Sequence, residues 1–341
     1  MMSTRILSER DVYELLPMKK CMRIMAETLK TAGRGGAANP LRTMLPLPDG
    51  SGLLGMMPAY LDSPKCTGIK VVTVMPGNHG TKFDAHQGAV LYFEAKHGCL
   101  RAVIDATSVT AIRTAAVSGV ATQLLAREDA ESLAILGSGV QARTHLGAML
   151  EARNITRIRV WSRSPENAAR FAQREVDRHG VAIEVSDSDS ARETVEGADI
   201  ICTTTSAAEP VLAGDWIRPG AHLNAVGACV PKARELDTPA VVRSRLFVDR
   251  MESALNEAGD ILIPIEEGAI GEDHILGEIG ELLLGEKQGR IAADDITLFK
   301  SLGIGVEDLG TAEYLHRKAV ETNAGLAVEF GGLRDGVGSS P

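Results

Sequence analysis

The sequence predicts an α/β protein with two kinds of sheet, the second of them a doubly wound parallel sheet of the Rossmann type. From residue 130 onward, apolar strands alternate with amphipathic helices, which is typical of a parallel sheet covered by helices on both faces. Residues 41–105 contain short β-rich runs separated by Asp-Gly, Pro-Gly and His-Gly turns, which indicates an antiparallel or mixed sheet. With 341 residues, 44% of them hydrophobic, the chain has enough apolar material for one large or two ordinary domains.

The first 127 residues are expected to form a helix, several short strands and a second helix. Residues 8–31 have helical spacing of apolar side chains, and Ser8 can cap that helix. The stretch GRGGAANP ends it. The expected strands are RTMLPL, LLGMMPAYL, TGIKVVTVMP, GAVLYFEAK and LRAVID. A helix from Thr107 to about Arg127 follows, built mostly of small and apolar residues, with Arg113 as the one full charge in its middle.

The rest of the chain has the strand–helix alternation of a parallel sheet. Expected strands are SLAILGSG, RIRVWSR, VAIEVS, ADIICTTTS and AHLNAVGA, and the intervening helices are VQARTHLGAMLEA and PENAARFAQREVDRH. After residue 250 the pattern is more broken, and we expect helices near 278–286 and 293–301. A last helix is expected over 311–330, followed by a disordered tail, GGLRDGVGSSP.

Composition excludes several classes of function. A net charge of −9 argues against a nucleic-acid partner, because phosphate binding requires a basic surface. The five cysteines are odd in number and form no CxxC pair, which favours reduced thiols over disulfides or a metal site. No apolar run approaches the roughly 20 residues of a membrane span, and the first residues lack the apolar region of a signal peptide. We therefore expect a cytoplasmic protein without a membrane partner.

The motif Gly137-x-Gly139-x-x-Ala142 lies between an expected strand and an expected helix, with Val140 and Gln141 at its centre. In a dinucleotide-binding turn the first glycine allows a tight bend, and the second allows main-chain N–H groups to approach the pyrophosphate. The third small residue allows the helix to pack closely on the strand. A glycine turn without a ligand is the alternative. The strands and the helix that surround the motif favour a dinucleotide-binding turn.

The end of the next strand indicates which dinucleotide is bound. NAD-specific sites usually place an acidic residue there to bind the ribose hydroxyls. This chain has Ser162, Arg163 and Ser164 instead, and these groups can bind a 2′-phosphate. The alternative is a solvated surface loop in which Arg163 binds no ligand. The sequence therefore favours NADPH, and use of NADH stays open.

Three cations occupy apolar elements of the chain: Arg42, Lys70 and Arg113. A buried guanidinium or ammonium group is tolerable only when an anion pairs with it. Each of these cations, taken alone, could instead form a structural ion pair, or lie at the surface with only the aliphatic part of its side chain buried. Their number, next to a dinucleotide fold, suggests a pocket for a carboxylate.

The chain resembles the ornithine cyclodeaminase/μ-crystallin family over nearly its whole length. The resemblance rests on the motifs NPLRTMLPLPDG, MMPAY, GIKVV, HQGAVLYF, IDATSVTAIRTAAVSG, LGSGVQAR, VWSRSPENAARFA, VGACVPKARELD and FKSLGIGVEDLGTAEYL. It implies an NAD(P)-linked enzyme acting on an amino acid or its cyclic imine. It also implies a split substrate-binding and dimerisation domain (1–128 with 305–341) around a Rossmann domain (129–304). A homodimer follows from the same resemblance.

By the resemblance, Arg42, Lys70 and Arg113 bind the substrate carboxylate. His86 lies toward the nicotinamide, although an isolated histidine is equally compatible with a structural role. The cofactor set is completed by Thr204, Val226 and Gly227, and the substrate pocket by Cys229, Glu257 and Ser301. Glu257 is alternatively a surface charge of a helix, and Cys229 a packed small residue.

Two departures from the cyclodeaminase pattern narrow the activity. Cys229 stands where cyclodeaminases carry an aspartate, and Gly55 and Met56 stand where they carry an acid. Without these acids no general base for an α-amine is evident. We therefore expect NADPH-dependent reduction of 1-pyrroline-2-carboxylate or 1-piperideine-2-carboxylate to L-proline or L-pipecolate. The alternatives are ornithine cyclodeamination, an alanine-type dehydrogenase, and a non-catalytic protein that binds NADPH and a small ligand.

Overall fold

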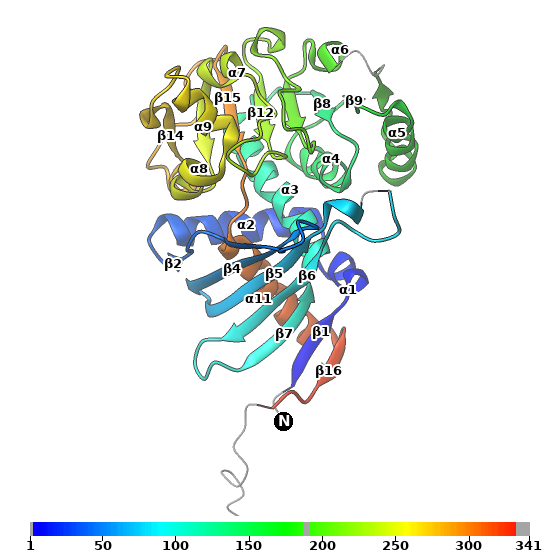
Figure 1. Ribbon diagram of the computed structural model, residues 1–341, viewed down its shortest axis with the longest axis vertical. Coiled ribbons are helices and arrows are strands. Elements are labelled where there is room, and N and C mark those ends of the chain that lie inside the picture. The colour runs from blue at the N-terminus through cyan, green and yellow to red at the C-terminus, as the bar shows by residue number, and fades with distance from the viewer. Residues whose placement is uncertain (1–2, 79, 187–190, 332–341) are drawn as a thin grey trace, which may run out of the picture. The chain divides into compact units, whose positions relative to one another are not determined.

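The computed structural model describes residues 3–78, 80–186 and 191–331, and the chain divides into two compact units (Figure 1). Unit 1 comprises Met1–Pro17, Gly35–Thr110 and Gly305–Pro341, and unit 2 comprises Met18–Arg34 and Ala111–Ile304. Residues 18–34 and 111–128 thus pack with unit 2, which contains the parallel sheet. The expected domain boundary between residues 128 and 129 stays a prediction. Within the described ranges, no helix is long and apolar enough to cross a membrane.

Unit 1 is built on a mixed eight-stranded sheet in the order β16-β1-β7-β6-β5-β4-β2, with β3 paired to β4. Of these strand pairs only β1–β7 is parallel. The strands are β1 (Thr4–Leu7), β2 (Ala37–Ala38), β3 (Thr43–Pro46), β4 (Leu53–Asp62), β5 (Lys65–Val74), β6 (His86–Glu94), β7 (Leu100–Asp105) and β16 (Leu326–Val328). The antiparallel or mixed sheet expected for residues 41–105 is confirmed, and the strand pairs within this range are antiparallel.

The two faces of this sheet differ because successive side chains alternate along each strand. Helix α11 (Gly305–Thr322) packs against β4, β5 and β6, and α1 (Glu9–Leu15) packs against α11 (Figure 1). The side chains under α11 are buried. On the other face, half-exposed apolar side chains form a row across four strands, in which Pro58, Ile69, Leu91 and Val103 are register partners.

Unit 2 contains an eight-stranded, wholly parallel sheet in the order β10-β9-β8-β11-β12-β15-β13-β14. Its strands are β8 (Ser132–Leu136), β9 (Arg157–Trp161), β10 (Glu184–Val185), β11 (Ile200–Thr203), β12 (His222–Ala225), β13 (Ser244–Val248), β14 (Ile275–Glu278) and β15 (Ile296–Lys300). Odd and even residues of its central strands enter two separate apolar clusters, one containing Leu133 and Ile135 and the other Ala134 and Leu136. A sheet buried on both faces explains the continuous apolar runs in the sequence.

The other α-helices of the described residues are α2 (Met18–Gly33), α3 (Ala106–Leu125), α4 (Val140–Ala152), α5 (Pro165–His179), α6 (Ala191–Val195), α7 (Thr238–Val242), α8 (Met251–Glu257), α9 (Gly259–Glu266) and α10 (Ile279–Leu284). Helix α4 is fixed to α3 through His145, whose Nδ1 lies 2.8 Å from the Gln141 carbonyl and Nε2 2.9 Å from the Ser118 hydroxyl. Burial lowers the pKa of His145 to about 4, so the ring is neutral near pH 7.

Three expectations about these elements differ from the structure. Residues 8–31 form two helices, α1 and α2, because Pro17 interrupts the helical pattern. The expected helix at 293–301 is the strand β15, and β13 and β14 were not anticipated. The last helix runs over 305–322 and is followed by β16, since Asn323 takes a φ of 53° and ends it. Most of the tail expected to be disordered lies outside the described residues.

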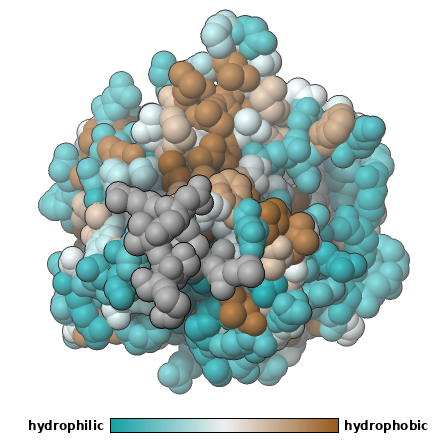
Figure 2. Space-filling model, turned by 90° about the horizontal axis from the view of Figure 1, so that it is seen from below, coloured by the Kyte–Doolittle hydropathy of each residue, from teal (hydrophilic) through white to brown (hydrophobic). Residues whose placement is uncertain are grey.

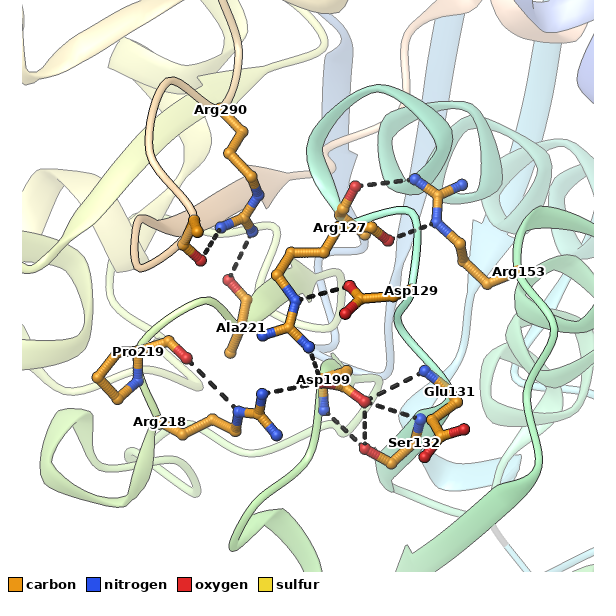
Figure 3. Close-up of polar contacts among 12 residues, drawn as sticks. Arg127, Asp129, Glu131, Ser132, Arg153, Asp199, Arg218, Pro219, Ala221 and Arg290 are labelled. Atoms are coloured by element: carbon orange, nitrogen blue, oxygen red, sulfur yellow. Dashed lines mark hydrogen bonds and ion pairs between the residues drawn. The ribbon is translucent and has the colours of Figure 1, made fainter.

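The amino ends of the parallel strands are joined by arginines and carboxylates (Figure 3). Asp199, which precedes β11, accepts the main-chain N–H groups of Glu131 and Ser132, each at 3.1 Å. It also pairs with Arg127 at 2.8 Å and Arg218 at 3.2 Å. These contacts tie together the amino ends of β8 and β11, whereas the predicted cofactor residues lie at the carboxyl edge.

Candidate functional site

The glycine motif forms the turn between β8 and α4, at the carboxyl edge of the sheet. Gly137 has a φ of +122°, and its N–H donates to the Trp161 carbonyl at 2.8 Å. A Cβ at this position would lie 2.7 Å from the Thr204 hydroxyl. Backbone conformation and packing therefore both require glycine here.

Gly139 is the N-cap of α4 and lies in an open region. A Cβ on Gly139 would meet no atom within 4 Å, so packing within the protein does not require glycine. Space beside the first turn of a 13-residue helix allows an anion to approach unpaired main-chain N–H groups. Ala142 is fully buried in the apolar cluster under the helix, while Val140 is 44% exposed and Gln141 half-buried. These residues fit a pyrophosphate group.

The loop after β9 is linked to this turn, since the Ser138 hydroxyl donates to the Ser162 hydroxyl at 3.0 Å. Arg163 is exposed. Ser164 caps α5 by accepting the Asn167 N–H, and it donates to Glu166 at 2.7 Å. This hydrogen bond lowers the pKa of Glu166. Of the two hydroxyls predicted to bind phosphate, that of Ser164 is therefore already used as a helix cap.

A cavity of about 330 Å³ lies between α4 and α5, beside the glycine turn. Its lining contains three arginines, Arg143, Arg170 and Arg174, and one carboxylate, Glu175. The other lining residues are Ser138, Gly139, Val140, Asn167 and Phe171. The excess of positive charge suits a phosphorylated ligand. The sequence analysis missed this set, although the spacing of Arg170 and Arg174 places both on one face of a helix.

The remaining predicted cofactor residues lie just beyond the carboxyl ends of β11 and β12. Thr204 donates both its N–H, at 2.9 Å, and its hydroxyl, at 3.1 Å, to the Leu136 carbonyl. The Val226 N–H donates to the Thr203 carbonyl at 3.0 Å. The N–H of Gly227 donates to Glu235 at 2.6 Å. The structure thus brings these residues together with the glycine turn at one edge of the sheet.

Two of the predicted substrate-pocket residues lie at the same edge of unit 2. Cys229 is half-buried, and its thiol lies 3.4 Å from the Val226 carbonyl and 3.9 Å from that of Ser301. Ser301 is itself buried and directly follows β15. Glu257, the last residue of α8, is half-buried rather than fully exposed.

In unit 1, Lys70 lies on the face of β5 that α11 covers. Its ammonium group is 2.8 Å from Asp308 in the first turn of α11, and both side chains are at least 97% buried. It also donates to the Thr110 hydroxyl at 3.3 Å. The sequence analysis missed Asp308, because no local signal pairs it with a residue 238 positions earlier. Burial explains why this lysine requires an anionic neighbour.

The other two predicted side chains of unit 1 are more accessible. Arg42 is half-buried and lies between β2 and β3. His86 is exposed at the start of β6, and its carbonyl accepts the Thr107 hydroxyl at 2.9 Å.

Arg113 belongs to unit 2 and is 3% exposed within α3. Its guanidinium lies against Gly303, which has a φ of +74°, and a Cβ there would lie 2.7 Å from Nη2. Asp249 holds this segment in place by accepting the N–H groups of Leu302 at 2.7 Å and Gly303 at 2.6 Å. Gly303 therefore provides the space that the arginine occupies.

Comparison with known proteins agrees with this geometry. The model of the ornithine cyclodeaminase/mu-crystallin family matches residues 2–323. The ketimine reductase mu-crystallin of Mus musculus is 42% identical over 282 residues, which cover 83% of this chain and 85% of that protein. A delta(1)-pyrroline-2-carboxylate reductase of Bacillus cereus is 35% identical over 326 residues, which cover 95% and 99%.

A solved structure is also similar over nearly the whole chain. It is that of Thermococcus litoralis delta(1)-pyrroline-2-carboxylate reductase in complex with NADH and L-proline. The TM-score is 0.92 at 40% identity, with 95% of this chain and all of that chain covered.

The contact between Gly303 and Arg113 yields a prediction about stability. Gly303→Ala would place a Cβ where the Arg113 guanidinium lies, and it would also strain a left-handed backbone. We expect it to lower the free energy of unfolding by about 2–5 kcal/mol. Gly268→Ala is the matched control, because Gly268 has a φ of +71° but no atom within 4 Å of a Cβ. Backbone strain alone should cost the control about 1–2 kcal/mol. Urea denaturation measures both, and equal losses would contradict the predicted contact.

Proposed function

The chain belongs to the ornithine cyclodeaminase/mu-crystallin family, and we propose that it is a nicotinamide-dependent reductase of small cyclic α-imino acids. The substrate proposed is 1-pyrroline-2-carboxylate or 1-piperideine-2-carboxylate, and the product L-proline or L-pipecolate. Relatives named as reductases of such compounds, at 35–42% identity, support the assignment. The observation that carries it is the presence of Cys229 just beyond β12.

A cyclodeaminase requires a group that takes a proton from an α-amine, and a carboxylate at this position would supply it. The Cys229 thiol instead lies near two main-chain carbonyls, toward which only its S–H is a suitable donor. A cyclic imine needs no such base. Its reduction requires binding of the carboxylate, a hydride at the imine carbon and a proton at the nitrogen.

Arg42, Lys70 and Arg113 are proposed to bind the substrate carboxylate. Two of these cations, Lys70 and Arg113, are 3% exposed, where an anion interacts more strongly than it does in water. Lys70 already pairs with Asp308, so Arg113 carries more of this argument. When bound, the reduced nicotinamide supplies the hydride. The imine can already carry its proton near neutral pH, and the exposed His86 is a secondary proposed source. Glu257 and Ser301 are proposed to line the pocket.

For the cofactor, NADPH is proposed to bind better than NADH. Arg163 is exposed beside the Ser162 hydroxyl, and three further arginines line the adjacent cavity between α4 and α5. A 2′-phosphate would find more positive than negative charge there. The Thermococcus litoralis relative was solved with NADH, so this chain is expected to accept both cofactors with unequal affinity.

A homodimer through the open face of the unit 1 sheet is also proposed. The row formed by Pro58, Ile69, Leu91 and Val103 has further half-exposed apolar neighbours in Met56, Val71 and Phe93. The space-filling view shows that apolar side chains gather in a band on the surface of the molecule (Figure 2). A contiguous apolar face of this kind is typical of a protein interface.

The activity is tested by steady-state assays with NADPH and the two cyclic imines, with NADPH replaced by NAD for ornithine and alanine. We expect the imines to be reduced. We expect Arg113→Ala to lower kcat/KM, by an amount that corresponds to a loss of about 2–5 kcal/mol of transition-state binding. The reason is that the variant lacks a desolvated partner of the carboxylate. The dissociation constant for NADPH should change far less. Ammonia release from ornithine without imine reduction would establish cyclodeamination instead, and no turnover at all would favour a binding protein.

Arg163→Ala tests the cofactor preference. A charged hydrogen bond to phosphate contributes roughly 1.5–3 kcal/mol, so the Michaelis constant for NADPH should rise about ten- to a hundred-fold. The constant for NADH should hardly change. Arg178→Ala, at the other end of α5, serves as a control and should affect neither. Equal losses with both cofactors would refute a phosphate contact at Arg163.

Leu91→Arg tests the dimer. A charge in the middle of the apolar row should shift the protein to a monomer, because burying an unpaired guanidinium is unfavourable. Leu326→Arg is the control, since Leu326 is 62% exposed on the edge strand β16. Light scattering at micromolar concentration measures both. A monomeric wild type, or a Leu91→Arg variant that remains dimeric, would contradict the proposal.

A further inference from the structure

Glu235 is a fully buried carboxylate in the loop that follows β12, and none of the roles proposed above uses it. Its two carboxylate oxygens accept four hydrogen bonds. Oε1 accepts the N–H of Thr205 at 2.6 Å and the hydroxyl of the same residue at 2.7 Å. Oε2 accepts the Gly227 N–H at 2.6 Å and the Thr203 hydroxyl at 2.8 Å.

These contacts join the segments that follow two neighbouring strands. Strands β11 and β12 are parallel partners up to the pair Thr203 and Ala225, and beyond that pair the chains separate into loops. Glu235 holds one main-chain N–H from each loop on a different oxygen. A Cβ on Gly227 would lie 2.7 Å from the Glu235 carboxylate, so the two loops and the carboxylate are closely packed.

A second buried carboxylate, that of Asp260, holds the main chain at Glu235. Asp260 accepts the N–H of Glu235 at 2.7 Å and that of Leu236 at 2.9 Å. Its other oxygen pairs with Lys300, the last residue of β15, at 2.8 Å, and both of these side chains are at least 99% buried. Burial raises the pKa of Glu235, whereas Lys300 opposes that shift. The network therefore ties the carboxyl ends of three adjacent strands together.

The same contacts extend to the glycine turn. Thr204 lies between two residues that Glu235 holds, and its N–H and hydroxyl both bind the carbonyl of Leu136. The Thr204 hydroxyl in turn lies where a Cβ of Gly137 would be. A displacement of the Thr203–Thr205 segment would therefore change the turn that faces the dinucleotide.

We propose that Glu235 is a positioning residue that holds the loops after β8, β11 and β12 in the conformation that binds the nicotinamide cofactor. This inference rests on the proposed function, because it assumes that Thr204, Val226 and Gly227 surround that cofactor. Glu235 acts through these loops, and it is not a catalytic residue.

Glu235→Gln is the direct test, because it keeps the shape and removes the charge. An amide has one acceptor oxygen, so either the Thr205 or the Gly227 N–H would face an NH₂ group. We expect the dissociation constants for NADPH and NADH, measured by calorimetry, to rise roughly ten-fold or more. In the assay, the KM for the cofactor should rise more than kcat falls.

Asp199→Asn is the matched control, since Asp199 also accepts two main-chain N–H groups, but at the amino edge of the same sheet (Figure 3). It should lower the melting temperature and leave cofactor binding within about two-fold. Thr205→Val is a milder variant that removes one hydroxyl donor, and it should weaken cofactor binding several-fold even if Glu235→Gln fails to fold.

The outcomes separate this inference from the proposed function. A folded Glu235→Gln or Thr205→Val variant that binds the cofactor like the wild type would overturn the positioning role alone. An equal loss of binding in Asp199→Asn would also overturn it, because the effect would then reflect stability in general. A wild type that binds neither cofactor would overturn the proposed function and this inference together.

Discussion

Two buried ion pairs hold elements of this protein against one another. Lys300 pairs with Asp260 and Lys70 with Asp308, all at most 3% exposed. Removing one partner from such a pair costs about 3–5 kcal/mol, since the other charge remains out of water. The pairs also fix geometry: Lys70 sets β5 against α11, and Lys300 sets β15 against α9. Much of the architecture that positions the candidate sites depends on this constraint.

The two edges of the parallel sheet are built from different kinds of contact. At the amino edge, Asp199 and the surrounding arginines engage one another and the nearby main-chain groups. At the carboxyl edge, glycines at 137, 139 and 227 bring main-chain atoms close to one another or leave open space. Ligands of open α/β sheets bind in the crevice outside the carboxyl ends of the strands. The open space beside Gly139 therefore lies at the edge where such a ligand is expected.

The sequence predicted the fold class, the family and the glycine turn between β8 and α4, because these depend on local patterns along the chain. It failed at 293–301, where a short apolar run fits a buried strand and a buried helix equally well. The neighbouring parallel strands decided between the two. Glu235, Asp308 and Asp249 were missed for a related reason. Each acts on groups distant in the sequence or in a neighbouring loop, and no spacing rule connects a carboxylate to such partners.

The path of the chain between the two units limits how this protein can be divided. The chain passes from one unit to the other four times, after residues 17, 34, 110 and 304, so neither unit is a continuous segment. The third passage lies inside α3, where a cut would leave main-chain N–H and C=O groups of a helical turn without partners. No single cut can therefore separate the two units, because removing either one as a continuous segment also removes part of the other.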